Sequence, residues 1–286
     1  MAISDTVVPR GPVTATLNFY SPPPDNSPPH NYVDSPPAGQ PQRNFSDNPQ
    51  DVLISDVRGH ESSYTLDTDA FQIVSGVPPS QETSFTSDTS IEANYYPELE
   101  ALLLRHIPGS HKIVFFDHTI RRANPSAPRN PVQRVHIDQT PTSAALRVRK
   151  HISDPQEAER LLSGRYRIVN VWRPLNKNPV ESFPLAFCSS STLRDSDVVP
   201  VEHRYNNGYT GQTAAIKHNP NQRWHYLSGM TGDERLLLEC FDSDSLKDGS
   251  GVKGGRVAHT AFADPRTREG AEPRESIEVR ALVFGP

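Results

Sequence analysis

The chain has 286 residues, of which 29 are basic and 34 are acidic, so its formal net charge is −5. Nucleic-acid-binding proteins usually carry a basic surplus, and this balance argues against such a partner. The longest apolar runs, such as Ile113 to Phe116, are far shorter than the roughly 20 residues that span a bilayer, and the N-terminus does not resemble a secretion signal. We therefore expect a cytoplasmic protein that binds no membrane and no nucleic acid.

The first fifty residues differ in composition from the rest of the chain. Residues 13 to 20 alternate between apolar and polar side chains, which predicts an edge strand. Nine of the thirty residues from 21 to 50 are prolines, and such a segment has few backbone donors and little apolar surface to bury. We therefore expect residues 1–50 to form an N-terminal edge strand and a Pro-rich flexible arm, and residues 51–286 to form a single domain.

After residue 51, short β-rich segments alternate with turn residues, and three helical patterns interrupt them. The expected helices are 97–107, 143–151 and 154–162, the last with Asp154 as its N-cap and Pro155 in its first turn. The expected strands are 52–57, 112–117, 133–138, 166–172, 212–218, 223–227, 234–241, 256–262 and 275–284. Strands and helices do not alternate regularly, so the pattern favours one mainly β sandwich or barrel with flanking helices over a doubly wound sheet.

One histidine, His136, is followed two residues later by an aspartate, Asp138. In a strand, residues i and i+2 point to the same face, so the imidazole and the carboxylate converge. That geometry suits two neighbouring ligands of one metal ion. The three-residue match alone favours a simpler alternative, a partly buried histidine that is hydrogen-bonded to the acid.

A facial metal site needs a third ligand, usually a second histidine. The candidates downstream of the pair are His203, His218, His225 and His259. We favour His259, because it lies in a compact strand-like stretch, 256–262, with another strand pattern close behind it.

That later strand carries an arginine and a serine two residues apart, Arg274 and Ser276, which share a face. A guanidinium fork beside a hydroxyl suits the distal carboxylate of a dicarboxylic cosubstrate, because the fork binds it through two hydrogen bonds. Taken as an isolated triplet, the pattern is explained as well by a surface ion pair of Arg274 with Glu272 or Glu275. Arg280 lies on the same face and is the reserve candidate for the carboxylate anchor.

Two other polar groups stand out. Asn170 shares the inner face of an apolar strand with Trp172, and a buried amide needs a partner, which the cosubstrate, the substrate or a strand-end hydrogen bond would supply. His118, followed by Arg121 and Arg122, is a candidate for binding an anionic ligand, and its default interpretation is a solvated loop.

Taken together, the HxD pair, the distant histidine and the RxS triplet form the constellation that non-haem Fe(II)/2-oxoglutarate oxygenases use. Several whole phrases also resemble one family, the hydroxylase/desaturase family of fungal secondary metabolism, which includes the aspergillic-acid hydroxylase, the gibberellin desaturase and a relative from cephalosporin methoxylation. The phrases are VHIDQT (135–140), IVNVWRPL (168–175), RWHYLSGMTGDERLLLECFDS (223–243), AHTAFADP (258–265) and RESIEVRALVF (274–284).

The resemblance covers nearly everything from about residue 13 to the C-terminus. It implies a double-stranded β-helix (jelly roll) that uses Fe(II), 2-oxoglutarate and O2 to hydroxylate or desaturate a small natural product. Its motifs map onto His136, Asp138, His259 and Arg274. The alternatives are a metal-dependent isomerase or lyase of the same pathway and a non-catalytic jelly-roll binding protein, in which the loss of a ligand would be expected. The residues do not identify the substrate or the oligomeric state.

Overall fold

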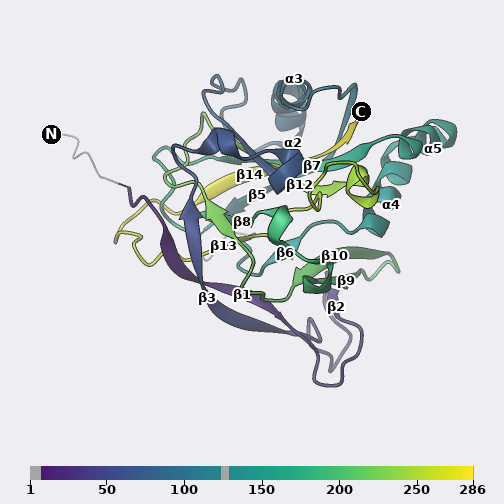
Figure 1. The fold of residues 1–286 in the computed structure, drawn as a ribbon, viewed down its shortest axis with the longest axis horizontal. Coiled ribbons are helices and arrows are strands. Elements are labelled where there is room, and N and C mark those ends of the chain that lie inside the picture. The colour runs from purple at the N-terminus through teal and green to yellow at the C-terminus, as the bar shows by residue number, and fades with distance from the viewer. Residues whose placement is uncertain (1–7, 124–128, 286) are drawn as a thin grey trace.

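A computed structural model describes residues 8–123 and 129–285. Two β-sheets face each other, and the helices lie outside them (Figure 1). This arrangement confirms a mainly β fold with flanking helices. No helix among the described residues is long and apolar enough to cross a membrane.

The larger sheet has nine strands and curls around the interior. Its central strands, β13 and β6, are very short and lie next to each other. In spatial order the strands are β1 (Val13–Ser21), β3 (Ser46–Asp56), β11 (Trp224–Tyr226), β8 (Leu185–Cys188), β13 (His259–Ala261), β6 (His136–Ile137), β10 (Thr210–Ile216), β9 (Val198–Arg204) and β2 (His30–Tyr32).

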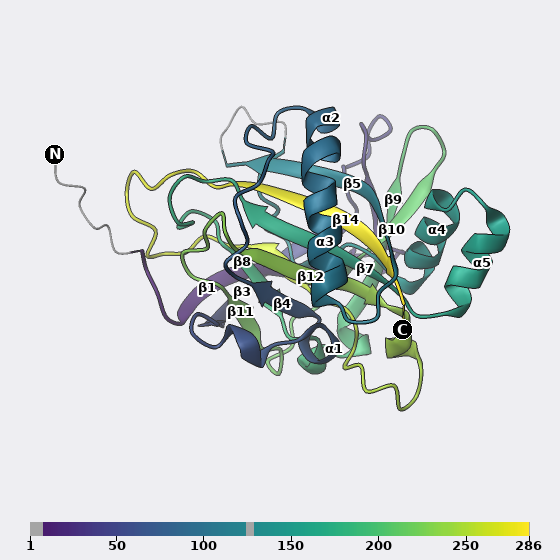
Figure 2. The ribbon, with the colours of Figure 1, turned by 90° about the horizontal axis from the view of Figure 1, so that it is seen from above.

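The smaller sheet has five strands, and its helical cover lies on the outer face (Figure 2). Its order is β4 (Phe71–Val74), β12 (Arg235–Asp242), β7 (Tyr166–Pro174), β14 (Glu275–Phe284) and β5 (Lys112–Arg122). The main helices are α3 (Tyr96–His106), α4 (Pro141–His151) and α5 (Pro155–Ser163). Short helical turns are η1 (Glu61–Ser63), α1 (Leu66–Asp69), α2 (Asp88–Ser90), η2 (Ile91–Tyr95), η3 (Ser190–Thr192), η4 (Asp195–Asp197) and η5 (Ser243–Leu246).

Every expected strand and helix overlaps an element of the structure, but the boundaries differ. The segments expected at 133–138 and 256–262 form only two and three strand residues, in β6 and β13. Helix α4 begins at Pro141, two residues before its expected start, because the Thr140 side chain accepts a hydrogen bond from the Ser143 amide and caps it. Asp154 caps α5 in the same way, as expected. Strands β2, β4, β8 and β9 were not anticipated.

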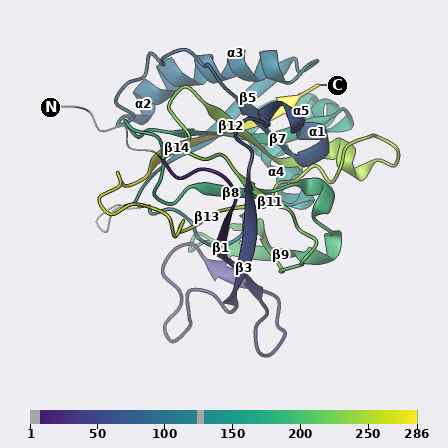
Figure 3. The same cartoon turned by 60° about the vertical axis from the view of Figure 1, so that its left-hand side comes forward.

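The N-terminal strand is part of the larger sheet. Strand β1 pairs along its whole length with β3, which already begins at Ser46, so the expected boundary after residue 50 falls inside β3. Strand β2 pairs in parallel with β9. Figure 3 shows the segment between β1 and β3 extending from one end of the molecule. The flexibility of the arm stays a prediction.

Apolar side chains fill two layers. On the outer face of the smaller sheet, Ile277 and Val279 of β14 pack in one cluster with Leu99 and Leu103 of α3. Between the sheets, a second cluster includes Phe19, Ile54 and Trp224. Because strand side chains alternate, β14 turns its other face, with Ser276, Glu278 and Arg280, toward the interior. The packed outer layer therefore holds a polar inner face in place.

Candidate metal and cosubstrate site

The three expected metal ligands meet near the centre of the larger sheet. His136 pairs directly with His259 across β6 and β13, and their ring centroids lie 4.4 Å apart. Asp138 follows two residues after His136, and its Oδ1 lies 3.4 Å from His136 Nε2. One ligand atom of each residue lies within 4.8 Å of the others, and within residues 8–123 and 129–285 this is the one such cluster of three. Two imidazoles and a carboxylate are the donors of a facial iron site.

Both histidines are oriented through the ring nitrogen that faces away from the cluster. His136 Nδ1 lies 2.8 Å from the Arg134 carbonyl oxygen, and His259 Nδ1 lies 3.2 Å from the Val257 carbonyl oxygen. A carbonyl only accepts, so each Nδ1 donates and each Nε2 keeps its lone pair for a metal. Burial, together with the charge of His136, lowers the pKa of His259, which favours the neutral form that a metal needs.

The carboxylate of Asp138 is fixed through its second oxygen. Asp138 Oδ2 accepts hydrogen bonds from Asn170 Nδ2 at 2.8 Å and from Arg280 Nε at 2.9 Å. Burial alone would raise the pKa of Asp138, but Arg280 and His136 hold that pKa well below its ordinary range. The carboxylate is therefore ionised at neutral pH, with Oδ1 directed to the histidines.

A cavity next to this cluster runs to the inner face of β14. Its lining includes His136 and His259 from the larger sheet and Arg274 and Ser276 at the start of β14 in the smaller sheet. The structure thus brings both expected metal histidines and both residues of the expected cosubstrate anchor into one cavity, although they come from three separate segments of the chain.

Arg274 is a buried cation with spare donors. Its side chain is 1% exposed, its Nη1 donates to the Phe183 carbonyl oxygen at 2.7 Å, and its guanidinium lies 5.6 Å from the centre of the Trp172 ring. Its Nε has no hydrogen-bond partner among the described residues. Burial and the charge of Arg121 lower the pKa of Arg274 to about 9. A carboxylate placed here would satisfy both the orphaned donor and the buried charge.

The reserve candidate, Arg280, is already fully engaged. Besides Asp138 it donates to Asp117 Oδ1 at 2.9 Å and to Glu278. Three carboxylates therefore surround it, and they raise its pKa well above the ordinary value against the opposing effect of burial. A guanidinium with these partners is poorly placed to bind a cosubstrate carboxylate, which favours Arg274 as the anchor.

Sequence reasoning missed this role of Arg280 beside Asp138. The two residues are 142 positions apart, so no local pattern links them. It also left the partner of Asn170 open, and the structure supplies Asp138. The Asn170 Oδ1 atom has no partner in the part of the chain that the structure describes. The only signal in the sequence for the pairing of Arg280 with Asp138 was the general rule that a buried carboxylate requires a cation.

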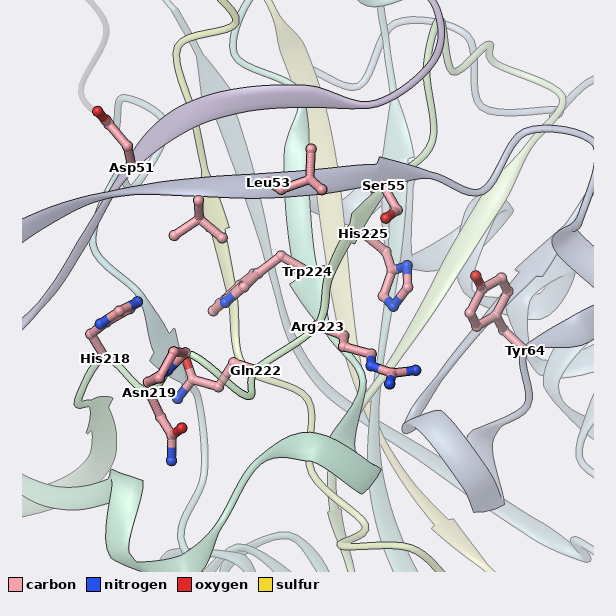
Figure 4. Close-up of a pocket in the computed structure, with 12 residues that line it drawn as sticks. Asp51, Leu53, Ser55, Tyr64, His218, Asn219, Gln222, Arg223, Trp224 and His225 are labelled. Atoms are coloured by element: carbon pink, nitrogen blue, oxygen red, sulfur yellow. The ribbon is translucent and has the colours of Figure 1, made fainter.

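The other candidate histidines lie outside the cluster. His203 Nε2 is 2.9 Å from Thr213 Oγ1, and the His218 ring packs edge-on against Phe19 at 5.0 Å. His225 lines a different pocket, between β3 and the segment 218–225 (Figure 4). In the strand pairing, Phe187 stands between His225 and His259, so this second pocket is separate from the metal cluster.

Comparisons with known proteins identify the class to which this fold belongs. A family model described as an oxidoreductase/YMDC permease-like domain matches residues 17–284. A solved structure of the iron and alpha-ketoglutarate-dependent endoperoxidase NvfI is similar with a TM-score of 0.85 at 31% identity, over 97% of this chain and 99% of that one. Fold and site together define a jelly-roll oxygenase of the Fe(II)/2-oxoglutarate-dependent class.

Two relatives narrow the class. The hydroxylase/desaturase poxK of Penicillium oxalicum is 42% identical over 260 residues, which are 82% of this chain and 79% of that protein. The Fe(II)/2-oxoglutarate-dependent dioxygenase nvfI of Aspergillus novofumigatus is 34% identical over 243 residues, 83% of this chain and 84% of that protein. The chain belongs to the fungal hydroxylase/desaturase family of secondary-metabolite biosynthesis. This membership favours an oxygenase over an isomerase, a lyase or a non-catalytic protein.

Proposed function

We propose that His136 Nε2, Asp138 Oδ1 and His259 Nε2 hold the Fe(II) of this oxygenase. The observation that carries the proposal is that the other polar atoms of these three side chains are already hydrogen-bonded to groups outside the cluster. Both Nδ1 atoms face backbone carbonyls, and Asp138 Oδ2 accepts from Asn170 and Arg280. The three remaining donor atoms converge on one point, with the charge and softness that suit Fe(II).

Arg274 and Ser276 bind the far carboxylate of 2-oxoglutarate in this proposal. Both side chains are almost fully buried, both line the cavity that contains the metal histidines, and Arg274 has an orphaned donor. Asn170 has a positioning role here, because it holds Asp138 in place, and its free Oδ1 remains available to the cosubstrate or the substrate.

Iron and 2-oxoglutarate, when bound, supply the oxidising power that breaks a substrate C–H bond. The contribution of the chain is geometric and electrostatic. Arg280 and Asn170 fix the carboxylate ligand, and the carbonyls of Arg134 and Val257 fix the two imidazoles.

The substrate in this proposal is a small natural-product intermediate, which is hydroxylated or desaturated. Support comes from the relatives, one of which is named a hydroxylase/desaturase and another an endoperoxidase. A product analysis by mass spectrometry would separate the outcomes, since hydroxylation adds one oxygen atom and desaturation removes two hydrogen atoms.

The proposal is tested by reconstituting the protein with Fe(II) under anaerobic conditions and then admitting air and 2-oxoglutarate. We expect one bound iron per chain and release of succinate. A His259→Ala variant should keep its thermal unfolding transition and lose both signals. Full iron occupancy in that variant, or a wild type that binds no iron and releases no succinate, would overturn the assignment.

A further inference from the structure

A second arginine lines the cavity beside Arg274. Arg121 lies on β5, and the pairing of β5 with β14 places it directly opposite Ser276. Residues paired in this way share a face of the sheet, so Arg121, Ser276 and Arg274 form one patch on the smaller sheet, whereas the histidines that line the same cavity belong to the larger sheet.

This patch carries an excess of positive charge. Neither Arg121 nor Arg274 forms an ion pair with a carboxylate in the described part of the chain, and Arg121 Nη1 donates only to the Asn130 carbonyl oxygen, at 3.2 Å. Glu278, the acid that also lines the cavity, is occupied by Arg280. Burial lowers the pKa of Arg121, the charge of Glu278 opposes this shift, and the charge of Arg280 adds to it. Burial and then the charge of Arg121 lower the pKa of Arg274, again against the charge of Glu278. A buried Arg274 without an ion pair, beside a partly buried Arg121, favours an anion in this cavity.

The neighbouring arginine shows that this arrangement is specific to one face of β5. Arg122 lies on the opposite face, and its Nε donates to Glu275 Oε2 at 3.2 Å. Two consecutive arginines of the same strand thus differ in their electrostatic partners: Arg122 faces an acid, whereas Arg121 faces the cavity.

We propose that Arg121 is a specificity-determining residue of the cosubstrate pocket: with Arg274 it forms a two-guanidinium clamp for the far carboxylate, which selects dicarboxylic over monocarboxylic 2-oxo acids. The proposal rests on the assignment of this cavity to 2-oxoglutarate. The metal-binding end recognises the 2-oxo acid group that both kinds of compound share. The clamp recognises the carboxylate that only the dicarboxylic compound has.

The test compares two probes that differ at that end alone, 2-oxoglutarate and 2-oxopentanoate. Their dissociation constants are measured by titration calorimetry on full-length protein loaded with Mn(II), so that no turnover is needed. We expect Arg121→Gln to weaken 2-oxoglutarate about 10- to 100-fold, since a hydrogen bond to a charged group is lost, and to leave 2-oxopentanoate unchanged. Arg121→Met should do the same, and Arg121→Lys should keep part of the selectivity.

Arg122→Gln is the matched control and should behave as the wild type. The ratio of the two dissociation constants is the decisive readout, because general damage to the cavity weakens both probes alike. An unchanged ratio in Arg121→Gln and Arg121→Met, with 2-oxoglutarate still bound by the wild type, overturns the clamp alone. A wild type that binds neither probe overturns the assignment of the cavity itself.

Discussion

Two buried histidines in one row of the larger sheet, His259 and His225, sit in different environments. Both are opposite Phe187 in the strand pairing, one on each side. His259 faces His136 and Asp138 and has its Nδ1 against a backbone carbonyl. His225 packs against the rings of Tyr64 and Phe71, with centroid distances of 5.0 and 5.6 Å, and its Nδ1 has no partner among the described residues.

The difference explains why we propose His259, and not His225, as a metal ligand. Burial is nearly the same, with 3% exposure for His259 and 8% for His225. Burial lowers the pKa of both rings, that of His225 to about 4. At the metal end a carboxylate and an oriented second imidazole complete the donor set, whereas at the other end aromatic rings surround a neutral imidazole that serves packing. The predictions below change the surroundings of one of these histidines at a time, or a region distant from both.

The largest effect is expected at the metal end. Asp138→Ala removes one ligand, and a change in a residue that only supports a ligand already costs about 10- to 100-fold, so metal affinity should fall by more than about 100-fold. Most activity should disappear. Arg280 keeps Asp117 and Glu278 as partners, so the thermal unfolding transition should remain cooperative. Iron analysis and calorimetry check this, and an iron-replete, active variant would contradict it.

The second-largest effect is expected on the affinity for 2-oxoglutarate, at the proposed carboxylate anchor Arg274. Arg274→Ala removes the more deeply buried of the two cations proposed for the cosubstrate carboxylate, which costs roughly 2 to 5 kcal/mol or about 30- to 5,000-fold in the dissociation constant of 2-oxoglutarate. Metal binding should persist. If 2-oxoglutarate affinity survives in Arg274→Ala and is lost in a metal-loaded Arg280→Gln variant, Arg280 is the anchor instead.

The aromatic surroundings of His225 predict a pH dependence of stability. Below about pH 6.5 the unfolded chain protonates His225, but the folded protein does not until about pH 4. The contribution of neutral, buried His225 to the free energy of unfolding is therefore fully present at neutral pH. It is lost as the pH falls from about 6.5 to about 4, by roughly 3 kcal/mol in all. His225→Phe should remove this part of the slope in urea unfolding at about pH 7.5 and 4.5. The exposed His60→Phe is the control, and equal slopes in His225→Phe and wild type would refute the prediction.

The smallest effect is expected far from both ends. Ser21 and Ser46 are paired at the tip of β1 and β3, so deleting residues 24–42 leaves a loop of about five residues, a normal length for a hairpin. Phe45, which packs on Tyr20, is kept. The deletion removes β2, which lies at the edge of the larger sheet and pairs only with β9, so we expect full iron binding and a small loss of unfolding free energy. Loss of iron together with early unfolding would show that the arm is part of the domain.

Local spacing in the sequence indicated two pairs of residues in the candidate metal and cosubstrate site. His136 and Asp138 converge because strand side chains repeat every two residues, and Arg274 and Ser276 follow the same rule. The structure then places the predicted third residue, His259, directly opposite His136. The alternation of apolar and polar residues likewise predicted most of the strands, since it depends on backbone geometry that holds wherever the strand lies.

Only the tertiary structure decided which charges meet. Arg280 bonds Asp138 because β14 of one sheet faces β6 of the other, and Arg121 faces Ser276 because β5 pairs with β14 in one particular register. A register shift of one residue would bring Arg122 to the cavity instead. Such pairings join segments far apart in the chain through many weak contacts, so no local pattern encodes them.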